Sequence, residues 1–190
     1  MKKWIFLIIS GLIIISGIYV IVSQSYPVAL VNWQLVSAKS FNNDFNTAFF
    51  YYQKVAETYD KSDATAINSP QAKTEIERAV LDKSVENILI MNELGKRLKN
   101  SEIEQMVQNK INEVFNGQDI AKQVATIYNL SLDAFKERVL TPEARTEILQ
   151  ARLMLENKNF DDWLKETKKQ AKVIILLPGF GWNGEGVVTK

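Results

Sequence analysis

The chain contains no cysteine and no histidine among its 190 residues. Without cysteine it can form neither disulfide bonds nor a thiolate nucleophile, and without histidine it lacks both imidazole acid–base chemistry and Cys/His zinc sites. Charge of one sign is not in excess either, because 23 lysines and arginines face 22 aspartates and glutamates. Such a balance gives no basic field for nucleic acid, so nucleic acid is not an expected partner.

A long run near the N-terminus, from Trp4 to Val22, carries no charge. As a helix rising about 1.5 Å per residue, it would roughly cross a hydrocarbon core of ~30 Å. Trp4 and Tyr19 lie near its two ends, where aromatic side chains meet the membrane interfaces. We therefore expect a transmembrane anchor over 4–22, with apolar residues such as Ile5 and Phe6 in contact with the lipid bilayer.

Flanking charges predict the orientation of this anchor. Lys2 and Lys3 precede it, whereas residues 23–35 contain no basic residue. The positive-inside rule therefore keeps residues 1–3 in the cytoplasm and places the rest outside it, on the periplasmic or cell-surface side. The alternative is a signal peptide cleaved at Ser23-Gln24-Ser25, but this apolar run is longer than a usual ~7–15-residue signal core.

Three short segments have strand character. Val28–Val31 and Gln34–Ser37 flank a turn at Asn32-Trp33, and Val173–Leu177 precedes the breaker Pro178-Gly179. A lone strand leaves its backbone groups unpaired, so we expect these segments from opposite ends of the domain to form one small sheet.

Helical spacing of apolar residues and capping signals predict the remaining elements. The expected helices are Ser40–Tyr59, Pro70–Lys99 with Ser69 as cap, Ser101–Phe115 with a Ser101/Glu104 capping box, Ile120–Tyr128, Leu132–Leu140 with Ser131 as cap, Thr141–Glu156 and Asn159–Gln170. The predicted fold is thus mostly α: a transmembrane helix followed by a multi-helix domain over 23–178 with a small β-sheet. Residues 179–190 would form a glycine-rich tail.

The order of these elements resembles the SurA N-terminal domain family of extracytoplasmic chaperones, which includes SurA, PpiD and PrsA-like foldases. The resemblance spans Val28 to Leu177. The matching pieces are Val31-Asn32, Val36-Ser37 and Phe41, Val80-Leu81-Asp82 before Ile88-Leu89-Ile90-Met91, Ser101-Glu102-Ile103-Glu104, and Asn129-Leu130-Ser131-Leu132-Asp133-Ala134-Phe135.

In that family parvulin isomerase domains are often inserted between the helical segment and the C-terminal helix and strand. The corresponding junction here is residues 156–159, which is far too short for such a domain, and the histidines that these isomerases usually employ are missing. The resemblance therefore implies a chaperone module without isomerase activity.

No catalytic or cofactor centre is expected. Asp161-Asp162, Glu102/Glu104 and Asp82/Glu86 are paired acids, but their helical spacing is typical of solvated faces. The glycine-rich stretch 179–186 lacks the following helix that a phosphate loop requires. Metals and cofactors are accordingly not predicted.

Exposed aromatic residues are the best candidates for peptide binding. Four consecutive aromatics, Phe49 to Tyr52, cannot all face one core, because successive helical residues differ by about 100°. If Phe49 and Tyr52 point inward, then Phe50 and Tyr51 point away and could hold an unfolded segment; the alternative is that they pack against a neighbouring element. Trp33 and Phe180 complete the candidate set, although Phe180 could instead tuck onto the sheet.

Two functions fit these features. The first is a membrane-anchored holdase that binds apolar segments of unfolded or nascent exported polypeptides, with no cofactor and no catalysis. The second is a structural or scaffolding subunit that docks onto one fixed partner of a membrane-bound complex. The sequence alone does not separate the two.

Overall fold

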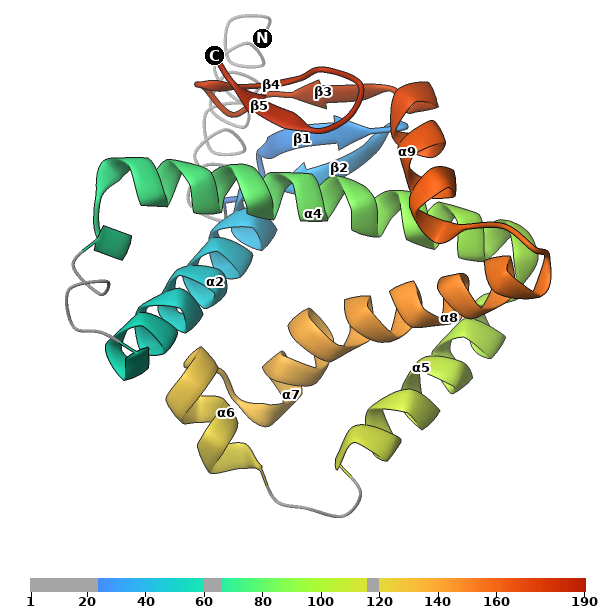
Figure 1. Cartoon of the computed structure of the whole chain (residues 1–190), viewed down its shortest axis with the longest axis horizontal. Helices are drawn as coiled ribbons and strands as arrows, with labels where there is room; N and C mark the ends of the chain where they lie inside the picture. The colour runs from blue at the N-terminus through green and yellow to red at the C-terminus, as the bar shows by residue number, and fades with distance from the viewer. Residues whose placement is uncertain (1–23, 60–65, 116–119) are drawn as a thin grey trace, which may run out of the picture.

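The computed structural model describes residues 24–59, 66–115 and 120–190 (Figure 1). Within these ranges the chain is mostly helical, with a small antiparallel sheet made of strands from both ends of the domain. The predicted anchor at 4–22 lies outside the described residues. Among those described, no helix is both long and apolar enough to cross a bilayer.

The N-terminal strands form the predicted hairpin. Strands β1 (Pro27–Val31) and β2 (Gln34–Ser37) pair antiparallel. Asn32 and Trp33 join them with positive φ angles of 47° and 70°. Positive φ at both central residues is the geometry of a two-residue type I′ turn, whose twist matches that of the flanking strands.

The predicted pairing of the two ends of the domain is also confirmed. Strand β3 (Val173–Ile175) runs antiparallel to β1, with Ala29 opposite Ile175, and the strand order is β2-β1-β3. The strand is shorter than the expected 173–177. The two residues beyond its end still bond to β1, because the N–H groups of Leu176 and Leu177 both donate to the carbonyl of Val28.

The predicted helices are present, with shifted boundaries. They are α2 (Ala38–Tyr59), α4 (Pro70–Arg97), α5 (Asn100–Phe115), α6 (Ala121–Tyr128), α7 (Leu132–Phe135), the π-helical turn η1 (Lys136–Leu140), α8 (Thr141–Leu155) and α9 (Phe160–Gln170). Ser69 caps α4 by accepting from the Ala72 N–H at 3.2 Å, and Ser131 caps α7 in the same way. In Figure 1, α4 lies between the sheet on one side and α2, α6, α7 and α8 on the other.

The expected capping box at Ser101 and Glu104 is wrong. Helix α5 already begins at Asn100, and the Glu102 side chain accepts the Lys99 N–H at 2.9 Å. The reciprocal half of a capping box is therefore made two residues earlier than predicted, because α5 starts almost immediately after α4 ends.

A helix break before Thr141-Pro142 is not observed. The chain stays helical from α7 through η1 into α8, and the Thr141 N–H bonds to the carbonyl of Lys136, five residues back. Pro142 has no N–H to donate to the carbonyl four residues before it. The wider π turn just ahead of the proline accommodates this missing donor without ending the helix.

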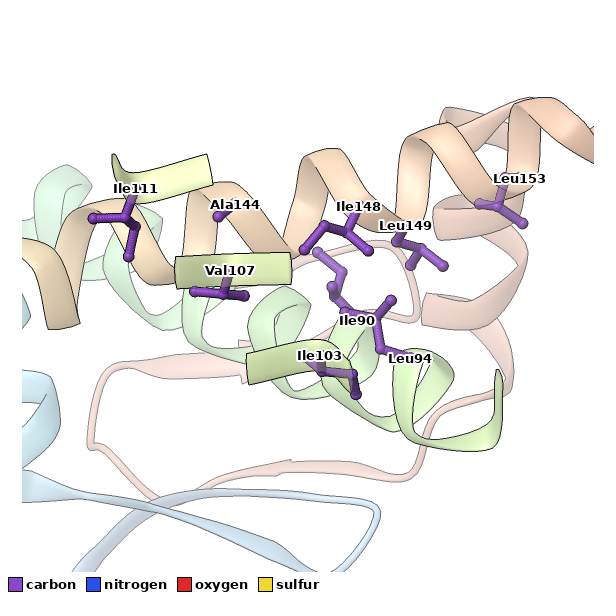
Figure 2. Close-up of a cluster of buried hydrophobic side chains, with 9 residues drawn as sticks. All are labelled: Ile90, Leu94, Ile103, Val107, Ile111, Ala144, Ile148, Leu149 and Leu153. Carbon is purple, nitrogen blue, oxygen red and sulfur yellow. The ribbon is translucent and has the colours of Figure 1, made fainter. Parts of the chain in front are cut away.

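Among the described residues, the hydrophobic core has three clusters of buried side chains, each of which includes residues of α4. Figure 2 shows the first, where side chains of α4, α5 and α8 converge: Ile90, Leu94, Ile103, Val107, Ile111, Ala144, Ile148, Leu149 and Leu153. The second lies under the sheet and combines β1, β2 and the start of α2 with Leu81 of α4. A third, smaller cluster of Val31, Val85 and Leu89 adjoins it.

The glycine-rich C-terminus is not a free tail. Residues 180–189 form the hairpin β4 (Phe180–Trp182) and β5 (Val187–Thr189), and Phe180 and Val187 are buried in the cluster under the sheet. The boundary expected after residue 178 therefore does not separate a tail from the domain. Tucking of Phe180 onto the sheet, the alternative left open by the sequence, is what occurs.

Candidate functional site

A pocket of about 230 Å³ lies between α2, α4, α6 and η1. Its walls combine aromatic and aliphatic side chains with a few polar ones. The lining residues are Asp44, Thr47, Ala48, Tyr51, Tyr52, Val80, Lys83, Ser84, Asn87, Tyr128, Arg138 and Val139. Such a mixture of apolar walls and few polar groups is typical of sites that bind organic ligands or peptide segments.

The π turn supplies one wall of this pocket. Arg138 and Val139 belong to η1 and line the pocket together with residues of α2. The wider π turn ahead of Pro142 therefore also sets the direction in which these two side chains point. π turns inside helices are frequent at functional sites because they re-aim side chains.

An aromatic ladder fixes α6 against α2. The rings of Tyr51 and Tyr128 are stacked with centroids 5.1 Å apart, and Tyr128 contacts the buried Phe135 at 4.8 Å. Burial raises the pKa of Tyr128, and the nearby Tyr51 raises it further. Tyr51 is therefore part of the pocket wall and also holds α6 against α2.

The pocket lining also contains polar groups. Burial raises the pKa of Asp44 to about 6, against the opposing effects of the Arg138 charge and a hydrogen bond with Ser40. The Oδ1 atom of Asn87 is buried and has no hydrogen-bond partner among the described residues. With Lys83 and Arg138 also in the lining, the pocket offers both donors and acceptors to a bound chain.

A second pocket of about 290 Å³ lies beside the first, where the end of α2 approaches the start of α4. It is lined by Tyr52, Ile67, Ala72, Glu75, Ile76 and Ala79. Tyr52 lines both pockets and is 45% exposed. We call the two pockets together with this side chain the Tyr52 site.

The structure places the four aromatic candidates from the sequence in different environments. Trp33 is 78% exposed but lies in the β1–β2 turn, on the other side of α4 from the Tyr52 site. Phe180 is only 4% exposed, so its expected role in peptide binding is wrong. Phe50 is half-buried beneath the Lys54 ammonium and lines neither pocket of the Tyr52 site.

The expected outward direction of Tyr51 is also wrong, since Tyr51 stacks on Tyr128 and Tyr52 is the exposed ring of the pair. The sequence does contain a signal for Tyr52. Ala48 on α2 and Ala72 and Ala79 on α4 are short side chains, and short side chains at a helix crossing leave space beside a large neighbour.

Lys168 marks a separate cluster of charges. Its ammonium is 2.7 Å from Glu86 and 3.2 Å from Asp82, and Asp82 also accepts the Val187 N–H. Burial, the largest influence, lowers the pKa of Lys168, but the two carboxylates outweigh it and raise the pKa overall. These bonds join α9 and β5 to α4, so the cluster is structural.

Among the described residues, no group of three or more acidic side chains is placed to hold a metal ion. No protein-family model, curated protein or solved structure matches the chain. Function is therefore inferred from the residues of the Tyr52 site and from the sequence.

Proposed function

We propose that the chain is a membrane-anchored, extracytoplasmic chaperone that holds apolar segments of unfolded exported polypeptides without catalysis. The observation that carries this proposal is the Tyr52 site: two adjoining pockets with a half-exposed aromatic ring between them. An extended segment lying along α2 would place one apolar side chain in each pocket and pack its backbone against the Tyr52 ring. Burial of apolar area supplies the affinity, at about 25 cal/mol per Å².

The polar groups of the first pocket suit a peptide backbone. The Asp44 carboxyl would accept a peptide N–H, and Lys83 or Arg138 would donate to a peptide carbonyl. Every polypeptide carries these backbone groups, so they add affinity without demanding a particular sequence. This combination fits a holdase better than a site for one fixed ligand.

The sequence supports the same proposal. The uncharged run 4–22, preceded by Lys2 and Lys3, would keep the domain at the outer side of the membrane, where exported chains emerge. The resemblance to the SurA N-terminal domain family implies a chaperone module. The four residues between α8 and α9 leave no room for an isomerase domain, so no prolyl isomerase activity is expected.

The test is the variant Tyr52→Ser in the full-length chain, reconstituted into lipid nanodiscs. We expect it to lose most of its ability to suppress aggregation of a chemically unfolded client, measured by light scattering, with little change in thermal stability because the ring is half exposed. Tyr26→Ser is the matched control, since Tyr26 is 42% exposed and lies beside the sheet instead. The control should protect the client as well as the unaltered chain does.

Two outcomes would contradict the proposal. If Tyr52→Ser and Tyr26→Ser protect equally well, the Tyr52 site is not where clients bind. If the unaltered chain protects no client and instead purifies with one stoichiometric protein, the scaffolding function takes its place.

A further inference from the structure

The sheet has an apolar face that points away from the core. Leu30, Leu35 and Ile174 are opposite one another across β2, β1 and β3, and their neighbours Ala29, Val31 and Val36 point inward and are buried. Leu176 follows Ile174 at the spacing of two that keeps it on the same face. Leu35, Ile174 and Leu176 are 63%, 51% and 45% exposed. We call this surface the outer sheet face.

Aromatic residues lie at the margin of this face. Tyr26 precedes β1, and Trp33 occupies the turn between β1 and β2 with 78% of its surface exposed. Trp33 has a φ of 70°, a conformation in which glycine is favoured and a tryptophan is strained. A large, strained and exposed tryptophan indicates that the ring is retained for a contact outside the domain.

The segments that form the sheet and its margins carry charge of one sign only. Residues 24–43 and 171–184 contain no aspartate or glutamate, and their only charged residues are Lys39 and Lys172. Both lysines are exposed. An apolar face with tyrosine and tryptophan at its margin and uncompensated lysines nearby matches the interface of a bilayer that contains anionic lipid.

The chain itself limits how far this face can lie from a membrane. The carbonyls of Gln24 and Tyr26 accept the N–H groups of Lys39 and Ala38, so residues 24–26 are held against the start of α2 and the end of the sheet. The uncharged run ends at Val22. From Val22 to Gln24 the backbone reaches at most about 7 Å.

We infer that the outer sheet face lies on the surface of the same bilayer that holds the anchor, with Trp33 and Tyr26 in the headgroup region and Lys39 and Lys172 beside anionic phosphates. This inference rests on the anchor of the proposed function. The Tyr52 site lies across α4 from the sheet (Figure 1), so this contact turns it toward the exported chains. The bilayer thus orients the domain as well as tethering it.

Single-cysteine labelling tests this directly, because the chain has no cysteine of its own. The variants Leu35→Cys and Ile174→Cys report on the outer sheet face. Met154→Cys is the matched control, since Met154 is 78% exposed and lies on α8. Each full-length variant is labelled with a polarity-sensitive fluorophore and placed, one chain per disc, in nanodiscs of phosphatidylcholine with a minority of phosphatidylglycerol.

We expect blue-shifted emission and several-fold weaker quenching by aqueous iodide at positions 35 and 174 than at position 154. Adding Leu35→Glu to the Ile174→Cys variant should restore quenching at 174 to the control value. Equal quenching at all three positions would overturn the inference. So would shielding that appears only in discs with two chains, because the face would then pair with a second copy.

Failure of this inference and failure of the proposed function give different results. Resistance of the chain to extraction from membranes by alkaline carbonate reports on the anchor alone. Client protection by Leu35→Glu reports on the Tyr52 site and should remain unchanged. An anchored chain that protects its client but shows full quenching at positions 35 and 174 refutes only the bilayer contact.

Discussion

Asp44 is a carboxyl whose burial makes stability depend on pH. Its pKa rises from the usual 3.8 to about 6 in the folded chain. Between these values the folded state binds more protons than the unfolded state, so the free energy of unfolding falls as pH rises from about 4 to about 6 and then levels off. This direction is opposite to that of a carboxylate held by a salt bridge.

The variant Asp44→Asn should abolish this decrease in the free energy of unfolding with rising pH. It carries no charge to bury, so above pH 6 it should melt a few degrees higher than the unaltered chain; about 1 kcal/mol corresponds to about 2–4 °C in a domain of this size. Melting curves of the fragment from Ser23 onward, which contains all three core clusters, measure the effect. Glu137→Gln, an exposed neighbour on η1, is the control and should change neither the midpoint nor its pH dependence. A variant that melts lower at every pH would indicate that the ionised Asp44 stabilises the fold.

Trp33 permits a second prediction. Trp33→Gly should raise the free energy of unfolding by about 1 kcal/mol, because glycine adopts the positive φ of a type I′ turn without strain and the exposed ring gives up little burial. Urea denaturation of the same fragment measures it. Leu35→Gly, in the adjacent extended strand, should destabilise instead. A loss of stability in Trp33→Gly would mean that the ring packs on the domain.

At the level of single residues, the sequence did not predict correctly which of the aromatic side chains at residues 49–52 face the interior of the domain. Periodicity alone placed Tyr52 inward and Tyr51 outward. Their positions depend on where α6 meets α2, since Tyr51 turns toward Tyr128, about 77 residues along the chain. A local pattern contains no information about such a distant partner.

The secondary-structure elements were more predictable, because their signals are local. Ser69 before Pro70 starts α4, and Asn32-Trp33 separates β1 from β2 as expected. Thr141-Pro142 was misinterpreted, since a proline marks either a helix start or an accommodated position inside a longer helix. The sequence does not show which of the two applies here, and it does not show that η1 lines the pocket beside α2.

The β4–β5 hairpin is not predicted from the sequence because three glycines interrupt it, yet it contributes to the core. Phe180→Ala should lower the free energy of unfolding by about 3–5 kcal/mol, because it opens a cavity beside Val28, Phe41 and Leu81. Urea denaturation followed by circular dichroism measures the change. Thr189→Ala, exposed in the same hairpin, should alter stability by no more than about 0.5 kcal/mol. If the two variants behave alike, the hairpin is not part of the cooperative core.

At the scale of the whole molecule, the pairing of β3 with β1 was predictable by exclusion, because Val173–Leu177 has no predicted strand partner nearby in the sequence. The candidate site was not predictable, because it arises where four elements from separate stretches of the chain meet. Of its lining residues, Tyr51 alone was among the sequence candidates. Aromatic character indicated the region of the proposed site, but the space between elements determines which aromatic side chain is exposed there.

The pairing of β1 with β3 also bears on how the protein is made. β1 is synthesised early, whereas Val173–Ile175, its partner, follows almost the whole domain. The α4–α5–α8 cluster joins residues 90–153 and is complete before that partner emerges. Contacts of such long sequence separation form late, because the intervening chain must first be ordered. During its own synthesis the protein therefore spends its last interval with one edge of β1 unpaired, as do the unfolded clients that it is proposed to hold.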